Sequence, residues 1–307
     1  MSNSRRVLVT GGAGYVGAVL CPQLLEAGYQ VRVLDTCWYG SDVFPSIPTD
    51  AEFDLIVGDI RIAEDVRSAL QGCTDVIHLA CISNDPSYDL DPQLGEDVNY
   101  LAFEPLVHMA KDAGVTRFVY ASSSSVYGIK DEEHVTEDLM LEPLTDYSRF
   151  KARCEEIVNS YADDEFVVTT IRPATICGYS PRQRLDVIVN ILVNHAVNRG
   201  VIRVFGGEQF RPNLHINDMC RAYLRVLQQP AELVQREIFN VGGINHTVTE
   251  LAEIVQANID REAAIEIEFT DDNRSYRISS ERIRQKLGFV PEKGVPDAVT
   301  DLVQAFN

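Results

Sequence analysis

The stretch VLVTGGAGYVGAVL, residues 7–20, decides the fold of this chain. Residues 6–10, RVLVT, predict a strand, and the apolar residues over 16–28 recur at helical spacing. The turn between them carries three evenly spaced glycines, Gly11, Gly14 and Gly17. Glycines at a strand-to-helix turn permit a tight bend, close packing of the helix on the strand, and approach of the backbone to a phosphate group. A loop of small residues without any ligand would have the same spacing, so the surrounding sequence has to decide.

Two further strands, expected over 30–35 and 53–60, each supply a carboxylate at their carboxyl end. Asp35 lies about 18 residues past Gly17, where an acidic residue can bind the ribose diol of a dinucleotide. Asp35 would repel a 2′-phosphate, and no arginine directly follows it, so the sequence favours NAD over NADP. Asp59 is a candidate contact to the adenine amino group. These features predict an NAD site on the first glycine turn.

Strands and helices alternate along the first half of the chain. Further strands are expected over 75–80, 115–122 and 167–175, and helices over 63–73 and 99–114. Strands separated by helices of this length form βαβ units with right-handed crossovers, so we expect a Rossmann-like, doubly wound parallel sheet in an α/β fold.

The pattern loosens after about residue 170. Helices are expected over 185–200 and over 247–259, the latter capped by Thr247, with short strands over 201–206, 236–243 and 263–270. We expect the cofactor-binding domain to span 1–171, with 213–244 returning to it. A smaller substrate-binding α/β region would then comprise 172–212 and 245–307.

Composition excludes several classes of function. The 307 residues carry a net charge of −19, which argues against nucleic-acid binding because phosphate contacts need a basic face. No apolar run approaches the roughly 20 residues of a membrane-spanning helix, and MSNSRR lacks the pattern of a signal peptide, so a cytoplasmic location is expected. The seven cysteines form no C-x-x-C motif and the six histidines show no ligand spacing, so no metal site is expected.

The segment DYSRFK, residues 146–151, predicts proton-transfer chemistry. Tyr147 and Lys151 are four residues apart on an expected helix with Asp146 as its N-cap, so they share one face. A tyrosine with its ordinary pKa of about 10 is a poor base, and a nearby ammonium stabilises its phenolate. A surface tyrosine and lysine on an amphipathic helix would show the same spacing, so the glycine turn and an upstream serine carry the argument.

These motifs occur together and in order. With HLA at 78–80, VN at 98–99, SSVYG at 124–128, RPNLHINDM at 211–219 and SSERIRQKLGF at 279–289, the chain resembles the extended short-chain dehydrogenase/reductases that act on nucleotide sugars. The resemblance covers essentially the whole chain. It implies cofactor contacts from Gly11, Gly14, Tyr15, Val16, Gly17, Asp35, Asp59, Ile60, Leu79, Ala80, Asn99, Tyr147 and Lys151.

The resemblance also assigns roles within the serine run 122–125. The hydroxyl three residues before Val126 hydrogen-bonds the reacting sugar hydroxyl in this family, which selects Ser123. The family's 4,6-dehydratases carry an aspartate and a glutamate at the next two positions, and its 3,5-epimerising members a cysteine at the second. This chain has Ser124 and Ser125 there, which argues against both reactions.

The nucleotide-sugar side is predicted with more alternatives left open. The candidate substrate contacts are Ser83, Asn84, Ser124, Ser125, Thr175, Arg182, Arg184, Arg211 and Arg274. Guanidinium groups suit a diphosphate, although pairing of these arginines with the abundant carboxylates and simple turn chemistry around Ser83 are alternatives. Pro212 replaces the aspartate usual after Arg211, and we expect His215 to be a structural hydrogen-bonding residue.

The resemblance implies an NAD-dependent nucleotide-sugar 4-epimerase that works through a 4-keto intermediate. The alternatives are a 4-oxidase or 4-keto reductase with net redox change and, less favoured because Tyr147 and Lys151 are both present, a non-catalytic NAD-binding regulatory protein. The resemblance also implies a homodimer formed through two helices, roughly 92–113 and 146–162, although packing in the core of the monomer explains their apolar faces equally well.

Overall fold

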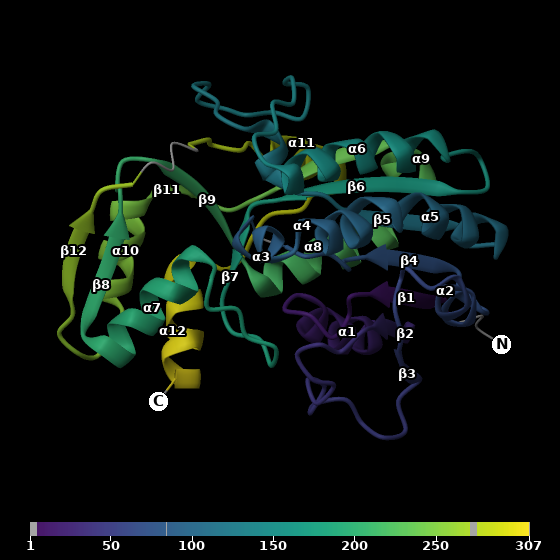
Figure 1. Ribbon diagram of the computed structural model, residues 1–307, viewed down its shortest axis with the longest axis horizontal. Coiled ribbons are helices and arrows are strands. Elements are labelled where there is room, and N and C mark those ends of the chain that lie inside the picture. Colours follow the sequence, from purple (N-terminus) through teal and green to yellow (C-terminus); the bar gives the residue numbers. More distant parts are fainter. Residues whose placement is uncertain (1–4, 84, 271–274, 307) are drawn as a thin grey trace.

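The computed structural model describes residues 5–83, 85–270 and 275–306. Its centre is a sheet of seven strands in the order β10-β6-β5-β4-β1-β2-β3, all paired in parallel (Figure 1). The strands are β1 (Arg6–Thr10), β2 (Gln30–Asp35), β3 (Phe53–Val57), β4 (Asp75–His78), β5 (Arg117–Ala121), β6 (Val167–Pro173) and β10 (Glu237–Val241). This confirms the expected Rossmann-like, doubly wound fold.

Alternation of side chains along the strands builds two cores, one on each face of the sheet. Val7 and Val9 of β1 belong to the core on one face, which α1 (Gly17–Glu26) and α8 (Ile216–Gln228) cover. Leu8 belongs to the core on the other face. That face is covered by α2 (Ala63–Leu70), α5 (Phe103–Asp112) and α6 (Asp146–Ser160).

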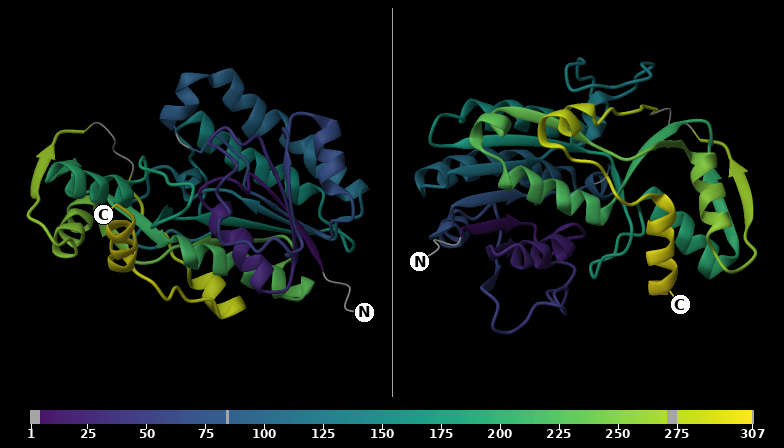
Figure 2. Two further views of the ribbon diagram at one scale, coloured as in Figure 1. Left: turned by 90° about the horizontal axis from the view of Figure 1, so that it is seen from below. Right: turned by 180° about the vertical axis from the view of Figure 1, so that it is seen from behind.

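A third core lies at the far end of the long axis from the large sheet, as the two views of Figure 2 show. It is built from α7 (Ile188–Arg199), α10 (Val248–Ala257), α12 (Val295–Phe306) and the parallel pair β8 (Val201–Phe205) and β12 (Ala264–Glu268). A small sheet, β11-β9-β7, lies between the two parts and comprises β7 (Thr175–Cys177), β9 (Phe210–His215) and β11 (Asn245–Thr247). The domain boundaries stay a prediction. The segment 213–244, which was expected to return to the cofactor-binding domain, contains β10, an edge strand of the large sheet.

The remaining elements are short. They are α3 (Asp85–Leu90), α4 (Pro92–Glu96), a π-helical turn η1 (Asp97–Leu101), a 3₁₀ turn η2 (Ser124–Tyr127), α9 (Ala231–Val234) and α11 (Glu281–Leu287). The single helix expected over 99–114 is therefore two elements, and the strand expected over 167–175 divides between β6 and β7, which belong to different sheets.

Two helix caps were expected from sequence, with different outcomes. Thr247 caps α10, in a capping box with Glu250, as expected. The prediction that Asp146 caps α6 was wrong, because Thr145 is the N-cap and Asp146 is the first helical residue. The Oγ1 of Thr145 accepts the Ser148 N–H at 3.3 Å, and the Ser148 hydroxyl lies 3.1 Å from the Thr145 N–H that donates to it. A carboxylate at the first position still favours the helix through its dipole.

The glycines of the first turn serve different purposes. Gly11 has φ of 71°, and a Cβ there would lie 2.6 Å from backbone atoms of Ala80. A Cβ on Gly17 would lie 2.3 Å from the Gly12 carbonyl oxygen. A Cβ on Gly14 would meet only the Gly11 oxygen, at 3.0 Å. Gly11 and Gly17 are therefore required by packing, whereas a Cβ on Gly14 would make a single tight contact.

We expect Gly17→Ala to lower the free energy of unfolding by about 2–4 kcal/mol, because backbone atoms that cannot move aside occupy the space of the added methyl group. Gly14→Ala is the matched control and should cost less, because its methyl group would meet one backbone oxygen at 3.0 Å instead of several backbone atoms at shorter distances. Urea unfolding of the ligand-free protein measures both. Equal losses in the two variants would contradict the packing argument.

Candidate active site

A cavity of about 810 Å³ opens at the carboxyl ends of the strands in the large sheet. It lies where the strand order reverses, between β1 and β4, which is where doubly wound sheets bind their ligands. The predicted site residues that line it are Gly11, Gly14, Tyr15, Val16, Gly17, Asp35, Asp59, Ile60, Leu79, Ala80, Ser83, Ser123, Ser124, Ser125, Tyr147, Lys151, Thr175, Arg182, Arg184 and Arg211. Asn84 and Arg274 lie outside the described residues.

One end of the cavity fits the adenosine half of a dinucleotide. The Asp35 carboxylate accepts the Ala13 N–H at 3.0 Å and the Cys37 N–H at 2.8 Å, so it is fixed at the glycine turn. The Asp59 carboxylate accepts hydrogen bonds from the guanidinium group and the backbone N–H of Arg61. These hydrogen bonds hold the pKa of Asp59 below its usual value. A fixed carboxylate beside a glycine turn that lines the cavity fits NAD.

Two predicted cofactor contacts also have structural partners. The Tyr15 hydroxyl donates to the Gly178 carbonyl at 2.7 Å, which ties the glycine turn to the segment after β7. Asn99 does not line the cavity. Its side-chain oxygen accepts the Ile82 N–H at 2.8 Å and its nitrogen donates to the Ile82 carbonyl at 3.0 Å, so it supports the segment after β4 from behind. Direct contact of Asn99 with the cofactor stays a prediction.

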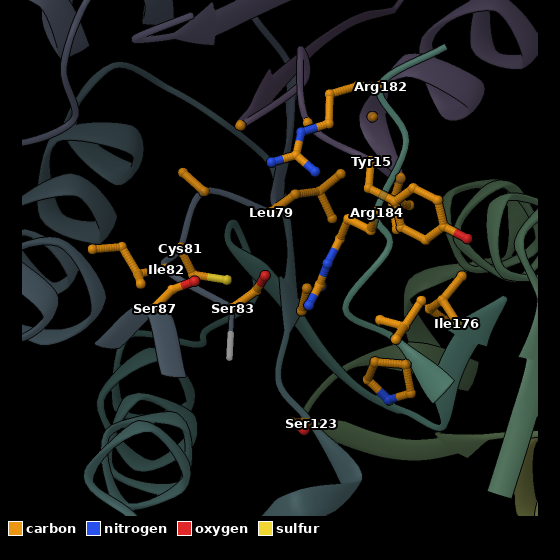
Figure 3. A pocket seen from close by; sticks show the side chains of 18 of the residues that line it. Tyr15, Leu79, Cys81, Ile82, Ser83, Ser87, Ser123, Ile176, Arg182 and Arg184 are labelled. Carbon is orange, nitrogen blue, oxygen red and sulfur yellow. The ribbon is translucent and has the colours of Figure 1, made fainter. Parts of the chain in front are cut away.

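The residues predicted to transfer protons lie on α6 and just after β5. Lys151 is 3% exposed, and its Nζ donates to the Ala121 carbonyl at 2.7 Å. The same nitrogen lies 5.9 Å from the centroid of the Tyr147 ring and 5.1 Å from that of the Tyr120 ring. Ser123 lies on the cavity wall (Figure 3), and its hydroxyl is 2.9 Å from that of Ser125. The structure thus gathers Tyr147, Lys151 and Ser123 around one cavity.

Another wall of the cavity carries cations. Figure 3 shows Arg182 and Arg184 extending into the cavity from one wall, with Cys81, Ser83 and Ser87 on the opposite wall. Arg184 Nε lies 3.1 Å from the Asp186 carboxylate, and Arg182 stacks 3.8 Å from the centroid of the exposed Tyr39 ring. Burial lowers the pKa of Arg184, but the hydrogen bond and charge of Asp186 outweigh it, so the pKa is raised.

Two further residues near the small sheet had been given predicted roles. The Arg211 side chain lines the cavity from β9 and donates to the Phe210 carbonyl at 3.1 Å. His215 precedes α8, where its Nδ1 accepts the Asn217 N–H at 3.1 Å and its Nε2 lies 3.2 Å from Asp301. These contacts agree with the structural role expected of this histidine.

The structure also brings in residues that the sequence did not single out. Aromatic side chains line the cavity at Trp38, Tyr39, Tyr223 and Tyr276. Trp38 is 53% exposed and Tyr39 69% exposed, and two adjacent aromatics just after the strand that ends in Asp35 are a signal that could have found them. Tyr223 and Tyr276 come from distant parts of the chain, and nothing in their local sequence marks them.

Below the serine run lies a buried ion pair that the sequence also did not reveal. Glu155 and Arg172 are 5% and 3% exposed, with Nη2 and Oε2 2.6 Å apart. Burial acts to lower the pKa of Arg172, yet the hydrogen bonds and charge of Glu155 outweigh it and raise that pKa. Burial raises the pKa of the neighbouring Tyr127 to about 12, so its hydroxyl stays neutral at physiological pH.

Comparisons with known proteins agree with this geometry. Residues 7–242 match the NAD dependent epimerase/dehydratase family. The UDP-glucose 4-epimerase of Mycolicibacterium smegmatis is 30% identical over 316 residues, which cover 98% of each chain. The dTDP-glucose 4,6-dehydratase DesIV from Streptomyces venezuelae, solved with NAD and TYD bound, superposes with a TM-score of 0.87 at 27% identity, covering 97% of this chain and 96% of its own. MoeE5 in complex with UDP-glucuronic acid and NAD gives 0.84 at 26% identity, covering 97% and 98%. The chain therefore belongs to the NAD dependent epimerase/dehydratase family, within the extended short-chain dehydrogenase/reductases, and is an NAD-dependent enzyme.

Proposed function

We propose that this chain is a nucleotide-sugar 4-epimerase that acts through a 4-keto intermediate. The observation that carries the proposal is the arrangement of Tyr147, Lys151 and Ser123 around a cavity whose other end holds the Asp35 carboxylate at a glycine turn. The 30%-identical relative, a UDP-glucose 4-epimerase along its whole length, supports it.

The roles of the residues follow from their placement. Tyr147 takes the proton from the C4 hydroxyl of the sugar and returns it at the end of the cycle. Lys151, held by the Ala121 carbonyl, stabilises the phenolate form of Tyr147 with its positive charge. Ser123 hydrogen-bonds the reacting hydroxyl and orients it. Bound NAD would supply the acceptor and donor of hydride at C4.

The carboxylates of the cavity argue for epimerisation over dehydration. Among the described residues that line it, the carboxylates are Asp35, Asp59 and Asp186. The first two lie at the predicted adenosine end, and Asp186 pairs with Arg184. At the serine run, Ser124 donates to the Tyr276 hydroxyl at 3.4 Å and Ser125 contacts Ser123, so these positions offer hydroxyls in place of an acid and a base for eliminating water.

The substrate is proposed to bind its diphosphate near the arginines and its sugar beneath Tyr147. Arg182, Arg184 and Arg211 supply planar guanidinium groups suited to phosphate oxygens, and Ser83 and Thr175 supply hydroxyl contacts. UDP-glucose is the first substrate to test because relatives from Mycolicibacterium smegmatis and Corynebacterium glutamicum are UDP-glucose 4-epimerases.

The deciding experiment incubates the purified protein with UDP-glucose or UDP-galactose and resolves the C4 epimers by chromatography. The absorbance of NADH is followed in the same samples. We expect both sugars to approach the same mixture without net NADH formation, because each cycle regenerates NAD. Stoichiometric NADH production would instead establish the 4-oxidase alternative, and no conversion of either sugar would direct the search to GDP-, CDP- and TDP-sugars.

We expect Tyr147→Phe to lower kcat by about 10²- to 10⁴-fold with little change in nucleotide-sugar affinity, because it removes only the hydroxyl that transfers the proton. Tyr179→Phe, on an exposed tyrosine outside the cavity lining, is the matched control. Steady-state kinetics and substrate binding by calorimetry measure the two effects. Wild-type kcat in Tyr147→Phe would remove Tyr147 from the mechanism.

A homodimer and a cytoplasmic location are part of the proposal. All seven cysteines are free thiols, which suits a reducing compartment. None of the helices in the described part of the chain is long and apolar enough to cross a membrane. At the family's dimer-forming helices, Leu101 is 53% exposed next to α5.

We expect Leu101→Glu to convert a dimer into monomers in sedimentation velocity, because it places a charge in the proposed apolar contact. Leu233→Glu, at a 39% exposed leucine of α9 on another surface, should leave the dimer intact. A wild-type protein that sediments as a monomer would end the dimer proposal.

A further inference from the structure

The four serines of the run 122–125 have different hydrogen-bond partners. Ser123 and Ser125 pair with each other, and Ser124 reaches Tyr276. The hydroxyl of Ser122, which is only 4% exposed, donates to the Glu155 carboxylate. Ser122 therefore faces the interior and fastens the run to α6.

Glu155 lies on the catalytic face of α6, four residues after Lys151 and eight after Tyr147. Lys151 and Glu155, one helical turn apart, contact two successive residues at the end of β5, Ala121 and Ser122. Lys151 donates to the Ala121 carbonyl at 2.7 Å, and Glu155 accepts the Ser122 hydroxyl. The two contacts together set the position of Ser123, the next residue, relative to Tyr147.

Arg172 connects Glu155 to the other end of the serine run, and we call this set of contacts from Glu155 and Arg172 to Ser122 and Tyr127 the clamp. Its Nε lies 2.9 Å from Glu155, and its Nη1 donates to the Tyr127 hydroxyl at 2.8 Å. Tyr127 closes the turn η2 that Ser124 and Ser125 begin, and its own hydroxyl donates to Asn240 at 2.8 Å. The run is therefore held through Ser122 before it and Tyr127 after it.

A buried ion pair of this kind is not needed for stability alone, because well-packed apolar residues often replace such pairs without loss. The pair does fix the orientation of its neighbours, since Ser122 and Tyr127 are both held by hydrogen bonds of defined geometry. Catalytic groups have to be held within about 0.5 Å of their productive positions. A misplacement of about 1 Å can cost a factor of about 10² in rate.

We propose that Glu155 is a positioning residue that, through Ser122 and Arg172, holds Ser123 at the distance from Tyr147 that proton transfer requires. This inference rests on the proposed function for its catalytic consequence. Its structural content, the clamping of residues 122–127 by Glu155, is independent of which substrate the enzyme takes.

Ser122→Ala is the primary test, because Glu155→Gln leaves the buried Arg172 without its counter-charge and threatens folding. Ser122→Ala keeps the Glu155–Arg172 pair, and the Glu155 oxygen that loses Ser122 still accepts the Arg172 Nε. We expect kcat to fall about 10- to 50-fold with KM for the nucleotide sugar within about twofold of wild type. The melting temperature should fall by about 2–4 °C at most.

Two comparisons separate positioning from a general structural effect. Ser122→Thr retains a hydroxyl and should recover part of the lost kcat. Ser160→Ala removes an exposed serine hydroxyl from the same helix, one that donates to the Ile157 carbonyl, and should leave kcat unchanged. A loss of stability with kcat intact in Ser122→Ala would overturn the proposal.

Hydrogen exchange of the amides of residues 122–128 gives a readout that needs no turnover. Exchange should be faster in Ser122→Ala and Glu155→Gln than in wild type, and unchanged in Glu156→Gln, which alters an exposed neighbour. Unchanged exchange in Ser122→Ala would refute the clamp. If the wild-type protein converts no nucleotide sugar, the proposed function fails, and these exchange rates still decide whether Glu155 clamps the serine run.

Discussion

The close approach of Gly11 to Ala80 is the contact on which the site depends. It joins the end of β1 to the end of β4, the two strands between which the order of the sheet reverses. No side chain fits between these two segments, so they meet in backbone contact. Beyond this contact they diverge, and the cavity opens between them. The Asp35 carboxylate accepts the Ala13 N–H, so the end of β2 is tied to the same turn. The shape of the cofactor end is thus a consequence of the order of three parallel strands and of one glycine turn.

A second constraint is the burial of the Lys151 ammonium. Taking a cation out of water is costly unless it is paired, and the contacts of Lys151 in the described part of the chain include an uncharged carbonyl and the rings of Tyr120 and Tyr147. A phenolate at Tyr147 would place an opposite charge near this ammonium, as the proposed mechanism requires. One turn further along α6, by contrast, the charge of Glu155 is neutralised by its ion pair with Arg172.

Local pattern made the sheet, the glycine turn and the Tyr147–Lys151 pair predictable, because spacing along one element fixes what each residue faces. It could not reveal relations between elements. Glu155 looks like any helical carboxylate until Arg172, on β6, is seen against it. Arg182 was expected at the substrate and stacks on Tyr39, which belongs to the segment after β2. The capping of α6 was misplaced by one residue because Thr145 and Asp146 both suit an N-cap, and only the backbone shows which of them precedes the helix.

The serine hydroxyls near Tyr147 bear on whether the site can accept both C4 epimers. An enzyme that interconverts two C4 epimers has to accept a hydroxyl group in either configuration at the same carbon. A carboxylate only accepts hydrogen bonds, whereas each serine hydroxyl donates one and accepts others and can rotate to do either. Ser123 and Ser125 already exchange such a bond, so each can release it to a substrate hydroxyl that arrives from either side. A wall of this kind discriminates weakly between the two epimers, and weak discrimination is what a freely reversible 4-epimerase needs.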